Sequence, residues 1–155
     1  STTTNPMPRH EDKFIGFDVP RHWEDRSIIA FAAPSDPKRD GSSNLVVTRE
    51  TPPAGESFDD YVARQLAELS SSRDGFERKQ KQRIELSGQA ACMVAFSSHG
   101  TQGPLEQRVV FAPLTSGQIV CITMTTPRAD AAQMTPLFDH IVRSITLEPK
   151  ASEKS

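Results

Sequence analysis

The chain has 155 residues, of which 35% are hydrophobic and 25% are charged, and its formal net charge is -2. This length predicts a single domain. The charge gives no basic excess for nucleic acid, and the apolar runs are too short to span a membrane, so we expect neither a nucleic-acid partner nor a membrane-embedded chain. The first dozen residues are polar and do not follow the pattern of a signal peptide, so the expected location is cytoplasmic.

Apolar runs predict three strands before a first helix and four strands between it and a second helix. The strands are expected at residues 13–19, 27–33, 44–50, 76–86, 89–97, 105–111 and 118–125. This order indicates an α+β fold with a largely antiparallel sheet of about six or seven strands and two main helices. We expect a flexible N-terminal arm over 1–12, a single α+β domain over 13–147 and a disordered tail over 148–155.

The first helix is predicted over residues 57–69. Its apolar side chains recur with a 3.6-residue period, and Ser57 with Asp60 forms a capping-box pattern at its start. Gln65 interrupts the apolar stripe, and a buried amide costs free energy unless it is hydrogen-bonded. Either Gln65 bonds a nearby backbone group of its own chain, or its amide is kept for the backbone of a partner.

The second helix is expected to end near Ile145, and Thr135-Pro136 fits its start as N-cap and first helical residue. Several strands are apolar on both faces, which is unusual for an antiparallel sheet with one wet face. Two arrangements explain this pattern. Either each helix covers one face of the sheet, or one face is left for a partner outside the monomer.

No pattern of catalytic or metal-binding residues is found. Cys92 and Cys121 lie in apolar runs and resemble small buried hydrophobic residues rather than a disulfide pair. The four histidines are scattered without metal-ligand spacing, and no phosphate-binding loop, dinucleotide-binding glycine pattern or nucleophile elbow is present. We therefore predict no catalytic residue, no metal and no cofactor.

The run from Arg78 to Arg83 has four positive residues in six. A charged edge strand that resists aggregation accounts for this run. Nucleic-acid binding would need further basic residues and exposed aromatic side chains elsewhere, so this function is not favoured.

Three motifs resemble those of one protein family. Val19-Pro20 is followed by Trp23, Asp25 and Ser27-Ile28, and the motifs V-T-R-E and F-D-D-Y-V-A-R-Q-L occupy residues 47–50 and 58–66. Together they resemble the Eag chaperones of bacterial type VI secretion, which belong to the wider DcrB-like group with a PsbP-like fold. The resemblance extends from about residue 14 to residue 147.

This resemblance implies a cytoplasmic homodimer without enzymatic activity. Eag chaperones bind the N-terminal region of effectors that carry PAAR domains, often Rhs-type toxins, and shield its transmembrane helices until the effector is loaded on the secretion spike. Both subunits hold the client in an apolar groove on the sheet. On this view, one face of the sheet would carry the helices and the other face would carry the client.

Several positions match the groove of the family. Ile28 and Val46 match its apolar residues, and Gln65 matches a glutamine that hydrogen-bonds the client. Ala30 stands where bulkier apolar residues are found, which would widen the groove. A transmembrane helix in water needs apolar cover, worth about 25 cal/mol per Å², and partners for its loose backbone groups.

The second glutamine of the family is not matched directly. Its equivalent is Val109, and Gln107 stands two residues earlier, on the same face of the strand, where it could substitute. The predicted client-binding residues are Ile28, Ala30, Val46, Gln65, Gln107 and Val109.

The sequence is also compatible with two other functions. A PsbP-like or DcrB-like accessory or cell-envelope protein without chaperone activity would have the same fold, and a signal peptide or a lipobox cysteine would favour it. A small enzyme would be revealed by a bound metal or cofactor.

Overall fold

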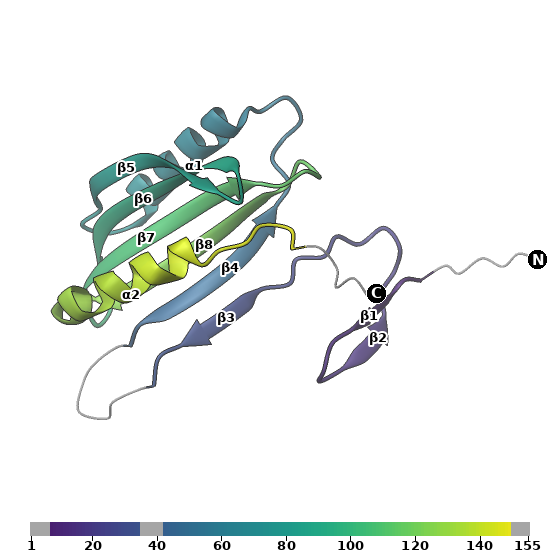
Figure 1. Cartoon of the computed structure of the whole chain (residues 1–155), viewed down its shortest axis with the longest axis horizontal. Helices are drawn as coiled ribbons and strands as arrows, with labels where there is room; N and C mark the ends of the chain where they lie inside the picture. Colours follow the sequence, from purple (N-terminus) through teal and green to yellow (C-terminus); the bar gives the residue numbers. More distant parts are fainter. Residues whose placement is uncertain (1–6, 35–41, 150–155) are drawn as a thin grey trace, which may run out of the picture.

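The computed structural model describes residues 7–34 and 42–149. Its main sheet has six strands in the order β3-β4-β8-β7-β6-β5, and all neighbours are antiparallel (Figure 1). The strands are β3 (Ile29–Ala32), β4 (Asn44–Glu50), β5 (Glu77–Leu86), β6 (Gln89–Gly100), β7 (Gly103–Pro113) and β8 (Ile119–Pro127). The helices are α1 (Phe58–Ser72) and α2 (Ala131–Arg143), with a 3₁₀ turn, η1 (Arg128–Asp130), before α2. This architecture confirms the predicted α+β fold with an antiparallel sheet.

The N-terminal segment forms a small sheet of its own. β1 (Arg9–Glu11) pairs with β2 (Gly16–Asp18), and the side chain of Asp12 accepts hydrogen bonds from two backbone amides in the turn between them. The strand predicted over 13–19 is therefore shorter than expected, and it pairs outside the main sheet. Residues 1–6 and 150–155 of the predicted arm and tail lie outside the described residues, and the domain boundaries stay predictions.

The two helices cover opposite faces of the main sheet. Tyr61, Val62 and Leu66 of α1 pack on side chains of β6, β7 and β8, whereas Phe138 and Val142 of α2 pack on the other face of the same strands. Figure 1 shows α2 in front of the sheet and α1 behind it. Of the two arrangements left open above, the first is confirmed. The arrangement implied by the resemblance, with both helices on one face, is wrong because both faces of β6–β8 are apolar and each needs cover.

Local sequence determines where α1 begins. The hydroxyl of Ser57 accepts a hydrogen bond from the backbone amide of Asp60, as the capping box predicted. Arg64 adds a bidentate ion pair to Glu56, with both N–O distances at 2.9 Å. These contacts fix the first turns of the helix to the segment that precedes it.

The predicted start of α2 is wrong. The helix begins at Ala131 and includes Pro136 in its interior, and the hydroxyl of Thr135 donates to the carbonyl of Ala131 instead of capping a new helix. Pro136 removes one intrahelical hydrogen bond, that of its missing N–H, and the helix continues through it. The half-buried Met134 joins the core on this face, which supports the earlier start.

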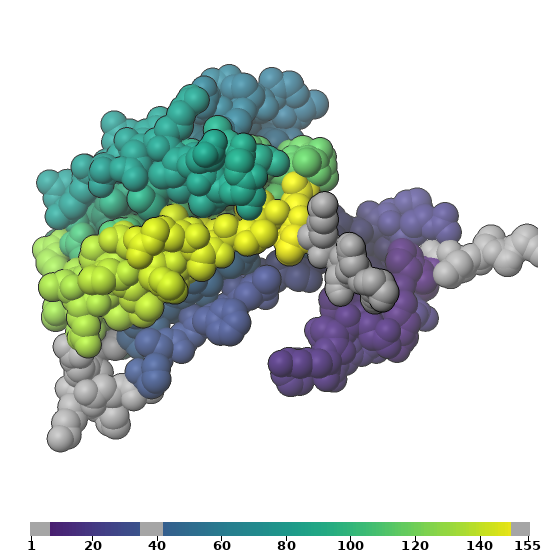
Figure 2. Space-filling view, in the orientation of Figure 1, coloured from purple at the N-terminus to yellow at the C-terminus, as the bar shows by residue number. Residues whose placement is uncertain are grey.

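The two edges of the sheet differ in character. β5 is the basic edge strand predicted from the sequence. β3 is a four-residue edge strand whose residues are all exposed, and Figure 2 shows that α2 does not cover it. Within the described residues, no helix has the length and apolar character needed to cross a membrane.

Candidate functional site

Most of the predicted client-binding residues lie on the face of the sheet that carries α1. Ala30, Val46, Thr123 and Val109 are paired in one row across β3, β4, β8 and β7. Residues paired directly across antiparallel strands point to the same face. Ile28, two residues before Ala30, continues this face toward the chain entering β3.

α1 covers one end of this row and leaves the other end open. Val109 is 4% exposed and belongs to the core beneath α1, whereas Val46 and Thr123 are half-buried and Ile28 is 63% exposed. We name the open part, Ile28, Ala30, Val46 and Thr123, the outer strip. Apolar and small side chains dominate it, so the outer strip can cover apolar surface of a partner. Thr123 was missed by the sequence analysis, although its alternation with Cys121 along β8 could have placed it on this face.

Gln65 projects from the side of α1 that faces the outer strip. It is half-buried, and its Nε2 lies 3.5 Å from Oε1 of Glu50. Glu50 also accepts a hydrogen bond from the hydroxyl of Tyr61. Gln65 therefore has a side-chain partner at the limit of hydrogen-bond distance instead of the backbone partner considered above, and its carbonyl oxygen remains available for a donor.

Tyr61, which shares Glu50 with Gln65, is fully buried. Burial raises the pKa of the Tyr61 hydroxyl well above its usual range, and the hydrogen bond that it donates to Glu50 adds to the effect. The Cys121 thiol lies 3.6 Å from the same hydroxyl, and burial raises its pKa as well. Both groups are neutral at physiological pH, and they serve as a packed support under Gln65 rather than as nucleophiles.

Gln107 is held within its own chain. It is 5% exposed, its Oε1 accepts from Nη1 of Arg73 at 3.0 Å and from Oγ of Ser98 at 3.1 Å, and its Nε2 donates to Oγ1 of Thr125 at 2.9 Å. These bonds satisfy most of the amide. A client could hydrogen-bond Gln107 only by replacing one of these partners. Val109 lies in the core beneath α1. The structure thus brings Ile28, Ala30, Val46 and Gln65 to one accessible surface and places Gln107 and Val109 below it.

The family motifs meet in space around this surface. Asp25 accepts hydrogen bonds from the backbone amide and the hydroxyl of Ser27, and it pairs with Arg49 at 3.0 Å. The next residue, Glu50, bonds Tyr61 and lies near Gln65. An ion pair therefore connects the motif at residues 19–28 to the V-T-R-E motif at residues 47–50, and hydrogen bonds connect the V-T-R-E motif to α1.

A DcrB family model matches residues 16–144. The chain belongs to the DcrB family. The curated protein Effector EagT6 of Pseudomonas aeruginosa is 29% identical to it over 136 residues, which make up 87% of this chain and 92% of EagT6. This similarity confirms the resemblance to Eag proteins that the motifs predicted.

Two solved structures extend the comparison. The crystal structure of PA94 from Pseudomonas aeruginosa, described as a putative regulator of unknown function, matches with a TM-score of 0.77 and 26% identity over 94% of this chain and 100% of PA94. The solution structure of the cyanobacterial PsbP protein CyanoP from Synechocystis sp. PCC 6803 matches with a TM-score of 0.52 and 12% identity, over 90% and 91% of the two chains. The second likeness shows the fold alone, and it confirms the PsbP-like architecture of this DcrB-family chain.

Neither EagT6 nor PA94 is named as an enzyme. In the part of the chain that the structure describes, no three His, Cys, Asp or Glu side chains gather as a group that could hold a metal ion. The two cysteines are free thiols, and burial raises the pKa of the Cys92 thiol. The outer strip with Gln65 is the candidate functional site, because exposed apolar side chains lie there on one sheet face beside an amide.

Proposed function

We propose that this DcrB-family chain is an effector-associated chaperone of type VI secretion, which binds and shields the N-terminal transmembrane helices of a PAAR or Rhs-type effector before export. The similarity to EagT6 supports the general assignment to the Eag proteins. The outer strip beside Gln65 is the observation that supports binding of transmembrane helices. An exposed isoleucine, an exposed alanine and a half-buried valine on one sheet face offer apolar cover, and the adjacent amide offers hydrogen bonds.

We also propose that the chaperone acts in the cytoplasm as a homodimer. Large apolar side chains are exposed throughout the N-terminal part of the chain. Phe14 is 84% exposed and Phe31 is 69% exposed, and Trp23 and Ile29 are exposed as well. Exposed apolar surface of this extent is typical of a partner interface. A second copy that covers part of this surface would leave the outer strips of both subunits for one client.

The test is co-expression with the hydrophobic N-terminal segment of a PAAR effector encoded beside this gene, followed by size exclusion with light scattering. We expect a soluble complex of two copies of this chain with one effector segment, and a dimer when the client is absent. An insoluble client beside a free monomer of this chain would remove the proposal. It would favour the alternative, an accessory or cell-envelope protein on the same fold.

The variant Ile28→Asp locates the site. A charge in the outer strip opposes burial of an apolar client, so we expect loss of the complex. Because Ile28 is largely exposed, the change should alter the free energy of unfolding by only about 0.5 kcal/mol and leave a soluble dimer. The matched control is Leu137→Asp, which places the same charge at an exposed apolar position of α2 on the other face and should keep the complex.

A further inference from the structure

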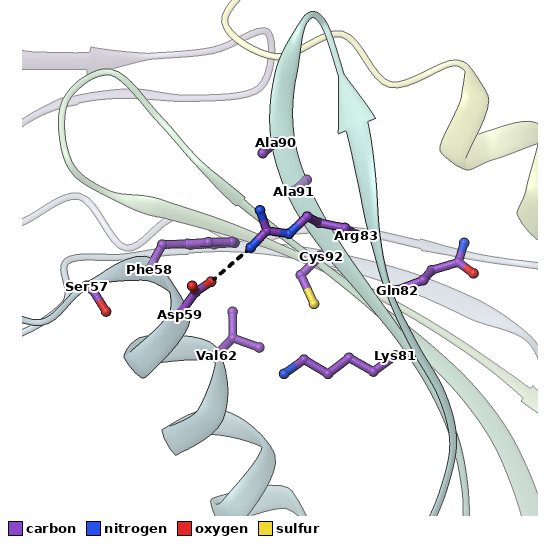
Figure 3. A pocket seen from close by; sticks show the side chains of 10 residues that line it. All are labelled: Ser57, Phe58, Asp59, Val62, Lys81, Gln82, Arg83, Ala90, Ala91 and Cys92. Carbon is purple, nitrogen blue, oxygen red and sulfur yellow. Dashed lines mark ion pairs between the residues drawn. The ribbon is translucent and has the colours of Figure 1, made fainter.

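α1 has a second open side, which faces away from the outer strip and toward β5. Two hollows of about 630 Å³ and 330 Å³ lie between α1 and the β5–β6 hairpin, and Lys81 lines both of them. We name them together the α1–β5 trench. Figure 3 shows its wider end, where Arg83 extends from β5 across the hollow to Asp59 and Lys81 points from the same strand toward Val62 of α1.

The two walls of the trench have opposite character. The α1 wall presents Ala63, Ala67 and Ser70, at i, i+4 and i+7 on one side of the helix, and these small side chains leave the trench open. Phe58 and Val62 extend this apolar wall toward the wider end. Burial of the alanine, phenylalanine and valine side chains of this wall against apolar side chains of a partner is favourable.

The β5 wall is cationic. Arg78, Lys81 and Arg83 are paired with Phe96, Val94 and Cys92 of β6, all of which point to the α1 face. A β-bulge between Arg78 and Gln80 keeps Arg78 on this face although it stands three residues before Lys81. The three cations therefore follow one another along the strand with a spacing of about 6.8 Å, which corresponds to two residues.

These positive charges are poorly balanced. Asp59 is the acidic residue that lines the trench, and its carboxylate lies 3.9 Å from Arg83, with both side chains largely exposed. Within the described residues, neither Arg78 nor Lys81 has an ion-pair partner, whereas their neighbour Lys79 pairs with Glu106 on the other face of the sheet. The trench thus carries an excess of positive charge beside an apolar wall.

We propose that the α1–β5 trench binds an extended acidic segment of a partner protein, in which aspartate or glutamate alternates with apolar residues. Carboxylates two residues apart in an extended chain match the spacing of the β5 cations, and the intervening side chains then face Ala63 and Ala67 of α1. Residues 1–6 have no charged side chain and residues 150–155 contain two lysines and one glutamate, so neither segment has the alternating acidic pattern that the site requires. The site lies on the opposite side of α1 from the outer strip, and it does not depend on the proposed client.

The test uses the full chain and a fluorescein-labelled peptide in which glutamate alternates with valine and leucine, measured by fluorescence anisotropy at low salt. We expect saturable binding to the wild type and at least tenfold weaker binding to the double variant Arg78→Gln/Lys81→Gln. The matched control is Lys79→Gln, which removes the same charge from the same strand but on the other face, and it should bind within about twofold of the wild type.

A second variant tests the apolar wall without changing charge. Ala67→Phe fills the trench from the exposed side of α1 and should also weaken binding at least tenfold, while the melting temperature confirms that the chain is folded. Absence of peptide binding to the wild type, or an equal loss in Lys79→Gln, would overturn the proposal. So would equal binding of a single-stranded oligonucleotide that is insensitive to Ala67→Phe, because the surface would then attract any anion.

Failure of this site and failure of the proposed chaperone function are distinguishable. If both proposals hold, Ile28→Asp keeps peptide binding and loses the effector segment, whereas Arg78→Gln/Lys81→Gln does the reverse. A trench variant that loses the effector segment together with the peptide would contradict a separate site.

Discussion

At the scale of single residues, the polar residues of the family motifs form hydrogen bonds and ion pairs within the chain. Asp25 closes the turn before β3 through Ser27 and reaches Arg49 on β4, so it aligns the entry of the edge strand that carries Ala30. Glu50 holds Tyr61 and lies beside Gln65, so it limits where that amide can point. These polar residues position the outer strip and are not part of its apolar surface.

The carboxyl of Asp25 gives a prediction about pH. Its hydrogen bonds from Ser27 and its pairing with Arg49 lower its pKa from 3.8 to about 2. Its contribution to stability is therefore present above the unfolded pKa and is lost only as the pH falls toward 2. In a two-dimensional NMR titration, the amide shift of Ser27 should stay constant from pH 6 to about pH 3. A step centred near pH 4 that disappears in Asp25→Asn would contradict this.

At the scale of the elements, α1 divides one face of the sheet into two surfaces. On one side, Gln65 faces the outer strip, and on the other, Ala63 and Ala67 face the cations of β5. The helix packs on β6, β7 and β8 and leaves both edge strands uncovered on this face. Both candidate binding surfaces depend on the helix keeping this position.

The cap of α1 is the element most easily tested. Ser57→Ala removes the acceptor for the Asp60 amide and should lower the free energy of unfolding by about 1 kcal/mol, or the melting temperature by about 2–4 °C. The control Ser71→Ala changes a serine in the last turn whose hydroxyl only donates to the carbonyl of Glu68, and it should not destabilise the chain. Equal melting temperatures for Ser57→Ala and the wild type would show that the cap contributes nothing.

Elements with strong local patterns were predictable from the sequence. Elements whose bounds depend on packing against the sheet were not. The strand at 44–50 and the start of α1 agree with their predictions because alternation and capping act locally. Thr135-Pro136 has the local pattern of a helix start, but burial of Met134 and Phe138 against the sheet favours an earlier one. The burial of Val109 and Gln107 was not predictable, because it depends on where α1 lies across the sheet.

At the scale of the whole molecule, the chain combines a well-packed centre with an open edge. β6, β7 and β8 lie between two helices, and their inward side chains form two cores on opposite faces. The segment from β1 to β3 instead exposes most of its large apolar side chains, and Figure 2 shows it projecting beyond the body of the sheet. A distribution of this kind suits a protein whose N-terminal part and sheet edge are completed by a partner.

Hydrogen exchange can measure this difference. In dilute protein, where a dimer dissociates, the amides of β6 and β7 should open only by global unfolding, whereas those of Gly16–Asp18 should exchange rapidly because β2 pairs only with the short β1. If a second copy covers this segment, the protection of β2 should rise as the protein concentration increases, while that of β6 and β7 should not. Protection of β2 as strong as that of β7 at every concentration would mean that the N-terminal sheet is stable by itself, and the exposed side chains would then give no support to the homodimer.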